Sequence, residues 1–134
     1  VSPFFARNQP SINVAVNPYR YYTVMMHDME GQFQHMLVMN AIGADVSIGQ
    51  VLQPYFSPLN FNSANHTYVW LVFEQDGTVD VDAADVEAWN VFVSGRVNLN
   101  VTQIADKYNL GAPVAINWAK TAVDAWVPGA WRSL

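Results

Sequence analysis

Two short apolar runs limit what this chain can fold into more than any other feature of its sequence. Residues 67–73 (TYVWLVF) are almost all β-branched or aromatic, and residues 33–39 (FQHMLVM) hold one histidine in a largely apolar run. A run of this length is either a strand buried on both faces or a piece of core helix. The residue types predict a strand for 67–73, and the short length favours a strand for 33–39 as well.

The other segments predict a β-rich domain with most of its strands first and its helices late. Alternating polar and apolar residues at 11–16 and β-forming residues at 21–26 predict two early strands. The later segments predict helices at 83–90, at 101–108 with Asn100 or Thr102 as the N-cap, and at 121–126, with strands at 89–93 and 114–118. This order favours an all-β or β-rich α+β class, in a single domain spanning residues 1–134, over a repeat of βαβ units.

The composition excludes several classes of function. The chain has 134 residues, 51% of them hydrophobic and 13% charged, with six basic against eleven acidic residues. The basic residues stand singly along the chain, which argues against nucleic-acid binding because phosphate neutralisation needs clustered positive charge. The absence of cysteine excludes disulfides, thiolate metal sites and cysteine nucleophiles. No apolar run reaches the roughly 18–20 residues of a transmembrane helix.

The first residue and two sequons favour secretion over a cytoplasmic location. The sequence begins at Val1 without an initiator methionine, so we expect that a preceding segment was removed by maturation, by nicking or by the choice of expressed region. The triplets at 65–67 (NHT) and 100–102 (NVT) match the N-x-S/T acceptor pattern. They predict glycosylation at Asn65 and Asn100.

Four stretches, in matching order and with near-matching spacing, resemble the phosphatidylethanolamine-binding protein family. Residues 22–30 (YTVMMHDME) are similar to the strand that leads into that family's D-P-D-x-P motif, and residues 34–40 (QHMLVMN) to its H-H-φ-L-V-x-N strand, where φ is apolar. Residues 66–75 (HTYVWLVFEQ) are close to its H-R-Y-V-[FW]-L-φ-[YF]-x-Q signature, which is the most specific of the four. Residues 108–115 (YNLGAPVA) resemble its Y-x-L-G-x-P-V-A segment.

The resemblance implies a fold and a binding role. The expected fold is a large antiparallel sheet packed on a smaller sheet, with short C-terminal helices. The expected role is non-catalytic recognition of a phospholipid headgroup or another small anion, without a cofactor or metal. By match to the family pocket, the implied ligand-binding residues are Asp28, Glu30, His35, His66, Tyr68 and, as an apolar wall, Trp131. Imidazole and phenol groups donate to phosphate oxygens, and a carboxylate orients a histidine or accepts from a ligand ammonium group.

The sequence departs from the family pattern in ways that leave a second role open. The D-P-D-A-P motif reads Asp28-Met29-Glu30-Gly31, the paired histidines read Gln34-His35, and the family's Gly-Pro-Pro loop and N-terminal stretch are absent. With these departures we expect a pocket that either accepts a different anion or is vestigial. In the latter case we expect an inhibitor or accessory subunit that binds a larger protein. Its anchors would be the C-terminal Trp126 and Trp131, since tryptophan is enriched at interfaces.

Simpler interpretations compete with each of these site assignments. A lone histidine in an apolar strand, such as His35, is more often a hydrogen-bonded core residue than a ligand. A metal site of His27, Asp28 and further histidines is disfavoured because adjacent strand residues point to opposite faces. The acidic residues at 80–85 lack the glycine and terminal glutamate of an EF-hand. No nucleophile–base motif is present, so we expect no enzymatic activity.

Overall fold

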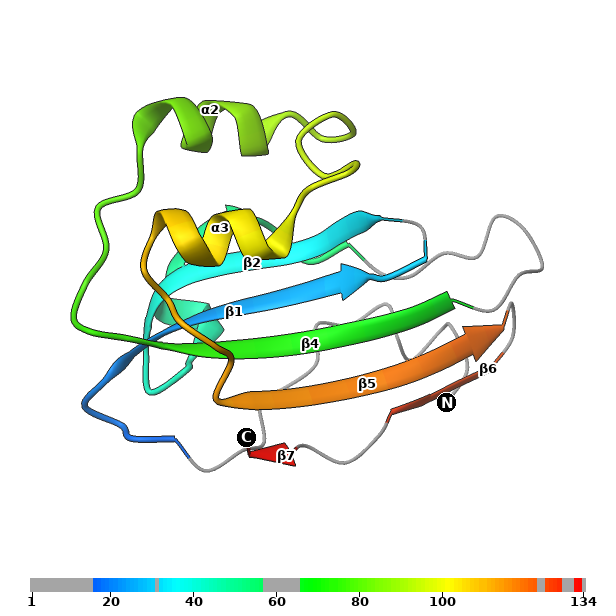
Figure 1. Cartoon of the computed structure of the whole chain (residues 1–134), viewed down its shortest axis with the longest axis horizontal. Helices are drawn as coiled ribbons and strands as arrows, with labels where there is room; N and C mark the ends of the chain where they lie inside the picture. The colour runs from blue at the N-terminus through cyan, green and yellow to red at the C-terminus, as the bar shows by residue number, and fades with distance from the viewer. Residues whose placement is uncertain (1–15, 31, 57–65, 123–124, 129–131, 134) are drawn as a thin grey trace.

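A single antiparallel β-sheet forms the framework of the structure (Figure 1). The computed structural model describes residues 16–30, 32–56, 66–122, 125–128 and 132–133. The strands follow the spatial order β3-β2-β1-β4-β5-β6, and β7 pairs with the same strand, β5, as β6 does. Their bounds are β1 Tyr21–Asp28, β2 Phe33–Ile42, β3 Gln50–Gln53, β4 His66–Gln75, β5 Ala115–Ala122, β6 Ala125–Pro128 and β7 Arg132–Ser133.

The central strands β1 and β4 are apolar along most of their length because both faces of the sheet are covered. Met25, Leu37 and Phe73 belong to a core on the face that carries the α-helices, here called the helix face. Val24 and Val72 belong to a second core on the opposite face, here called the far face. The 3-10 helix η1 (Val46–Ile48) packs on this face through Val46. Two buried faces explain why the sequence of these strands does not alternate between apolar and polar residues.

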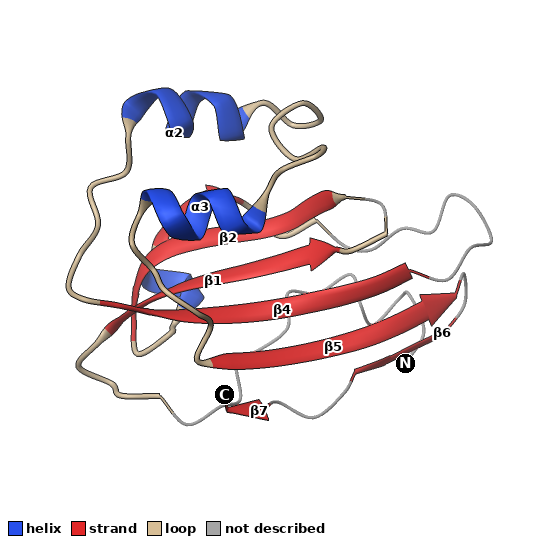
Figure 2. Ribbon diagram, viewed as in Figure 1, coloured by secondary structure: helices blue, strands red, loops and turns tan. Residues whose placement is uncertain are grey.

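Two short helices cover the helix face (Figure 2). Helix α2 (Ala83–Asn90) begins after Asp82, whose side chain accepts a hydrogen bond from the Ala84 amide. Helix α3 (Val101–Lys107) has Asn100 as its N-cap, and the Asn100 side chain accepts from the Gln103 amide. Within the described residues, no helix is long and apolar enough to cross a membrane.

A β-bulge interrupts the pairing of β1 with β2 at the end of the sheet that carries the candidate site. Met26 pairs with Met36, but the next residue, His27, pairs with Gln34, so His35 is the extra residue. A bulge changes which face the following side chains reach. In an uninterrupted strand His35 would share the helix face with Leu37; instead its ring packs against Tyr68 of the far face, with ring centroids 5.2 Å apart.

The structure confirms most of the predicted elements. The strands expected at 21–26, 33–39, 67–73 and 114–118 and the helices expected at 83–90 and 101–108 are all present, with Asn100 as the cap of the second helix. The β-rich class is confirmed. The strand expected at 11–16 lies outside the described residues.

Three expectations about the later part of the chain are wrong. Residues 91–97 form turns instead of a strand, because α2 continues to Asn90 and buries Trp89 in the core. The helix expected at 121–126 is replaced by strands in its described part: residues 121–122 of β5 pair with residues 125–126 of β6, and pairing along a sheet edge overrides weak helix propensity. The helices are therefore not C-terminal but lie between β4 and β5, and the described strands make one sheet without a smaller partner sheet.

Candidate functional site

A carboxylate–imidazole pair joins the end of β1 to the start of β4 on the far face. Asp28 pairs directly with Tyr68 across the two antiparallel strands, and His66 lies two residues before Tyr68 and therefore on the same face. The Asp28 Oδ2 atom lies 2.7 Å from His66 Nδ1. Because a carboxylate only accepts, His66 donates from Nδ1 and its ring is held in one orientation. Asp28 is buried, whereas the His66 side chain remains partly exposed.

His35 is held beside this pair as a neutral ring. Its Nδ1 atom lies 2.6 Å from the Phe56 carbonyl oxygen, which can only accept, so Nδ1 carries the proton and Nε2 is left as an acceptor. The ring stacks on Phe56 and meets Tyr68 edge-on. Burial lowers the pKa of His35 to about 4, so the ring is uncharged at neutral pH. Burial, with the nearby charge of Asp28, raises the pKa of Tyr68, and its hydroxyl keeps its proton.

Glu30 ties the turn after β1 to the first residues of β4. Its Oε2 atom accepts from the Thr67 amide at 2.5 Å, and the Thr67 carbonyl accepts from the Met29 amide at 2.9 Å. The Glu30 amide in turn donates to Asp28 Oδ1 at 3.2 Å. The exposed carboxylate of Glu30 thus lies at the edge of the site. Its bond to the Thr67 amide links the backbone after Asp28 to the backbone after His66.

Arg96 is the residue of this region that the sequence did not reveal. The side chain is only 4% exposed, and its guanidinium donates to the carbonyl oxygens of Gln34 (3.1 Å), His35 (2.9 Å) and Pro54 (2.6 Å). Its cationic centre also lies over the rings of Phe56 and Phe92, at 5.9 and 5.3 Å from their centroids. Arg96 therefore binds the backbone of the bulge itself and acts as a positioning residue for His35.

The residue before Arg96 has no room for a side chain. A Cβ atom at Gly95 would meet the carbonyl oxygens of Val91, Ala88 and Trp89 at contact distances that real Cβ atoms do not show. The Gly95 carbonyl also accepts from the Gln53 side chain at 2.7 Å. The turn that contains Gly95 and Arg96 is thus packed directly against the end of α2.

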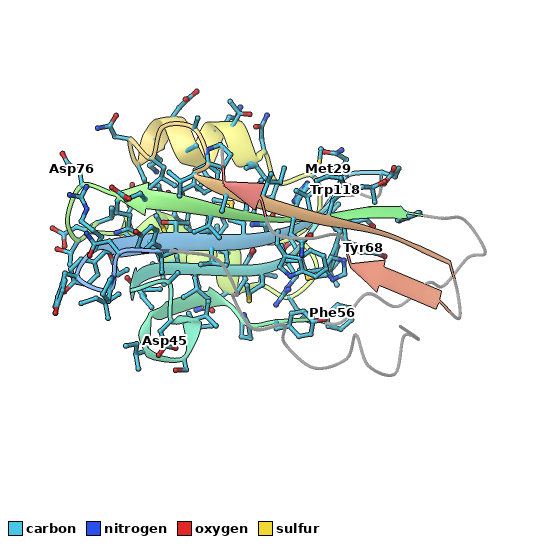
Figure 3. The ribbon with its side chains drawn as sticks, turned by 90° about the horizontal axis from the view of Figure 1, so that it is seen from below. Met29, Asp45, Phe56, Tyr68, Asp76 and Trp118 are labelled. Atoms are coloured by element: carbon cyan, nitrogen blue, oxygen red, sulfur yellow. The ribbon has the colours of Figure 1, made fainter. Side chains whose placement is uncertain are left out.

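The structure brings most of the predicted site residues together. Asp28 and His66 are hydrogen-bonded, His35 and Tyr68 are in ring contact, and Glu30 borders them (Figure 3 shows Tyr68 with Phe56 at this end of the sheet). Trp131 and Asn65 lie outside the described residues. Asn100 is exposed at the start of α3, on the other side of the sheet. Across the part of the chain that the structure describes, no three histidine or acidic side chains are grouped to hold a metal ion.

The arrangement places acceptors and donors side by side. Asp28 and Glu30 are carboxylates, and neutral His35 adds an acceptor nitrogen. Tyr68 contributes a hydroxyl, and the second nitrogen of His66 faces away from its bond to Asp28. Such a set of side chains can form hydrogen bonds with a small polar ligand.

The fold and this site define a β-sheet domain with a compact polar site at one end of its central strands. No family model matches the chain. A curated relative, "Putative odorant-binding protein A5" of Drosophila melanogaster, is 31% identical over 143 aligned residues, covering 99% of this chain and 67% of the relative. The chain therefore belongs to the same family as that protein.

Replacing Arg96 with methionine tests its role at the bulge. Arg96→Met removes the guanidinium donors from the carbonyls of Gln34, His35 and Pro54, of which only the His35 carbonyl is shown to keep another donor, the Phe56 amide. We expect the free energy of unfolding to fall by about 2–4 kcal/mol. The matched control Arg20→Met removes an exposed ion pair with Glu74 and should cost less than about 1 kcal/mol. Urea unfolding of both variants measures the difference; equal losses would contradict the assignment.

The buried neutral His35 also predicts a pH dependence of stability. Its pKa is about 4 in the folded protein and about 6.5 in the unfolded chain, so the unfolded state binds more protons between these values. Stability is then complete above pH 6.5 and falls as the pH drops towards 4. Between pH 7 and pH 5 this contributes a loss of about 2 kcal/mol.

His35→Gln isolates that contribution, since glutamine can still donate to the Phe56 carbonyl but does not titrate. Urea unfolding at pH 7 and pH 5 should show a loss that is smaller by about 2 kcal/mol in the variant. His27, whose pKa burial also lowers, contributes equally to both proteins. The same pH dependence in both would show that His35 is not held neutral.

Proposed function

We propose that this chain is a non-catalytic binding protein that holds a small phosphate-like headgroup at the site of Asp28, His35, His66 and Tyr68. The observation that carries the proposal is the buried Asp28 carboxylate, hydrogen-bonded to His66 and facing Tyr68 and His35 on one side of the sheet. The resemblance to the phosphatidylethanolamine-binding proteins supports this ligand class, since the residues that implied it come from three different strand segments.

The charges of the site favour a ligand that carries an ammonium group as well as the phosphate. Asp28 and Glu30 place negative charge beside the site, and His35 is neutral, so a bare anion would be repelled. A linked ammonium group would be attracted to the Asp28 carboxylate while the Tyr68 hydroxyl donates to a phosphate oxygen. An ethanolamine phosphate has this pattern of charges.

A binding role also agrees with the relative in the fly. The name of that protein describes odorant binding. We propose the same general role here, together with secretion and glycosylation at Asn65 and Asn100. Asn100 is exposed, and its Oδ1 acceptor, which caps α3, is not the atom that carries a glycan.

Phosphoethanolamine and inorganic phosphate, titrated by calorimetry at pH 7, test the proposed ligand class. We expect phosphoethanolamine to bind at least about ten-fold more tightly, equivalent to about 1.4 kcal/mol from the ammonium–carboxylate contact. Asp28→Asn should remove this preference. The matched control Asp45→Asn, an exposed residue at the start of η1 that keeps its capping oxygen, should leave it unchanged. Equal binding of both compounds to the unmodified protein would contradict the proposal.

A second candidate function is binding to a larger protein, as an inhibitor or accessory subunit. The turn after α2 exposes the consecutive residues Val91, Phe92 and Val93, by 52%, 53% and 59%, and Val97 nearby by 40%. A cluster of exposed apolar side chains marks an interaction surface more often than scattered ones do. The C-terminal anchors expected from the sequence, Trp126 and Trp131, have side chains outside the described residues.

Sedimentation of the native material tests this second function. A partner-bound chain should sediment above the monomer mass of 15.0 kDa with a second polypeptide present. Val93→Ser should weaken that association, because it puts a hydroxyl into an apolar contact, whereas the control Val51→Ser, half exposed on the edge strand β3, should not. A stable species at the monomer mass with no co-purifying chain would rule the partner function out.

A further inference from the structure

A cavity lies on the helix face, on the opposite side of the sheet from the polar site. Its volume is about 460 Å³, within the range of small-molecule pockets. The sheet supplies its floor through Val69, Leu71 and Ile116, and the segment entering α3 supplies a wall through Leu99 and Val101. In Figure 3 Met29, which also lines this cavity, projects on the side of the sheet that carries α3, whereas Tyr68 and Phe56 lie towards η1.

We infer that this cavity is a binding site for a small, neutral, apolar molecule that carries a hydroxyl group. The inference goes beyond the function proposed above, because it concerns different residues, the other face of the sheet and a ligand without charge. The ligand class follows from the aliphatic walls of the cavity and from one buried histidine that lines it.

The walls select an uncharged and largely apolar ligand. The five floor and wall residues are aliphatic, and none of the residues lining the cavity is aspartate, glutamate, lysine or arginine. An ion would lose its hydration there without gaining a partner of opposite charge, which is strongly unfavourable. The volume accommodates a small molecule, whereas it is far too small for a helix or a folded partner.

His27 gives the cavity one buried hydrogen-bonding group. The side chain lines the cavity although it is only 3% exposed, and its Nδ1 atom lies 2.5 Å from Gln34 Oε1 on the neighbouring strand. The Gln34 oxygen accepts, so Nδ1 carries the proton and Nε2 is the acceptor of the neutral ring. The two ring nitrogens of an imidazole diverge, so Nε2 is directed away from Gln34 on β2. The strand on the other side of β1 is β4, whose Val69 pairs with His27 and lines the cavity. A ligand hydroxyl donates to such a nitrogen, whereas an ether or a ketone cannot.

The rim of the cavity is held in place before any ligand arrives. The Asn98 amide donates to the Gln32 carbonyl at 2.7 Å, and both residues, which line the cavity, have left-handed backbone angles, with φ of 56° and 52°. The Phe33–Val97 bridge continues this contact. These contacts join the segments that carry Gln32 and Asn98 without a ligand, which lowers the cost of ordering them on binding.

Two isomeric probes test the inference: 4-propylphenol, which can donate a hydrogen bond, and 4-ethylanisole, which cannot. Titrations followed by amide chemical shifts should place 4-propylphenol at residues 69–71 and 98–102, with an affinity at least about five-fold higher than that of 4-ethylanisole. His27→Phe keeps a flat ring but removes the acceptor, and should bring the two affinities together. Ile116→Trp should fill the cavity and abolish binding of both, while the control Ile48→Trp, at an exposed position in η1, should bind both normally.

Each outcome decides for or against the site. Equal affinity of the two isomers for the unmodified protein, shifts confined to the far face, or unchanged binding in Ile116→Trp would overturn the inference. If Ile116→Trp does not fold, Val101→Trp at the opposite wall gives the same test. Phosphoethanolamine binding should be unchanged in Ile116→Trp, and propylphenol binding unchanged in Asp28→Asn, so failure of one site is distinguishable from failure of the other.

Discussion

The contact of one buried guanidinium with three backbone carbonyls determines how this end of the sheet is built. Arg96 carries its charge into the interior, where an unpaired cation would be strongly destabilising. The carbonyls of Gln34, His35 and Pro54 offset this cost as acceptors, and the faces of Phe56 and Phe92 add a cation–π contribution. Two of these carbonyls, those of Gln34 and His35, lie where the β1–β2 pairing is interrupted. The bulge and the arginine therefore stabilise each other, and the face that His35 reaches depends on both.

The sequence predicts the part of the site that follows from simple alternation. His66 and Tyr68 are two residues apart in a strand with an unambiguous apolar pattern, so they share a face. The resemblance assigns Asp28 to the same pocket, and the structure adds that Asp28 lies opposite Tyr68. The position of His35 cannot be read in this way. Alternation alone would put it beside Leu37 on the helix face, and nothing in residues 33–39 marks the extra residue of the bulge.

The role of Arg96 could not be predicted from the sequence because all of its described contacts are with residues that only the fold brings close. In the sequence it is one of six isolated basic residues, and isolated arginines are usually exposed. Its partners are main-chain oxygens more than 40 residues away, which leave no trace in the identity of any side chain. The strand wrongly expected at 89–93 and the helix wrongly expected at 121–126 have a related cause. Both segments are short and apolar, and their conformation is decided by what they pack or pair against.

The lack of space at Gly95, which precedes Arg96, limits the substitutions that this turn can tolerate. At position 95 even a methyl group would collide with three main-chain oxygens at the end of α2, and those atoms cannot move away as a flexible side chain could. Any larger residue would displace the turn, and the guanidinium would be carried away from the bulge with it. A Gly-Arg pair at this place in a distant homologue would therefore indicate that His35 reaches the same face there, even where the surrounding strands have diverged.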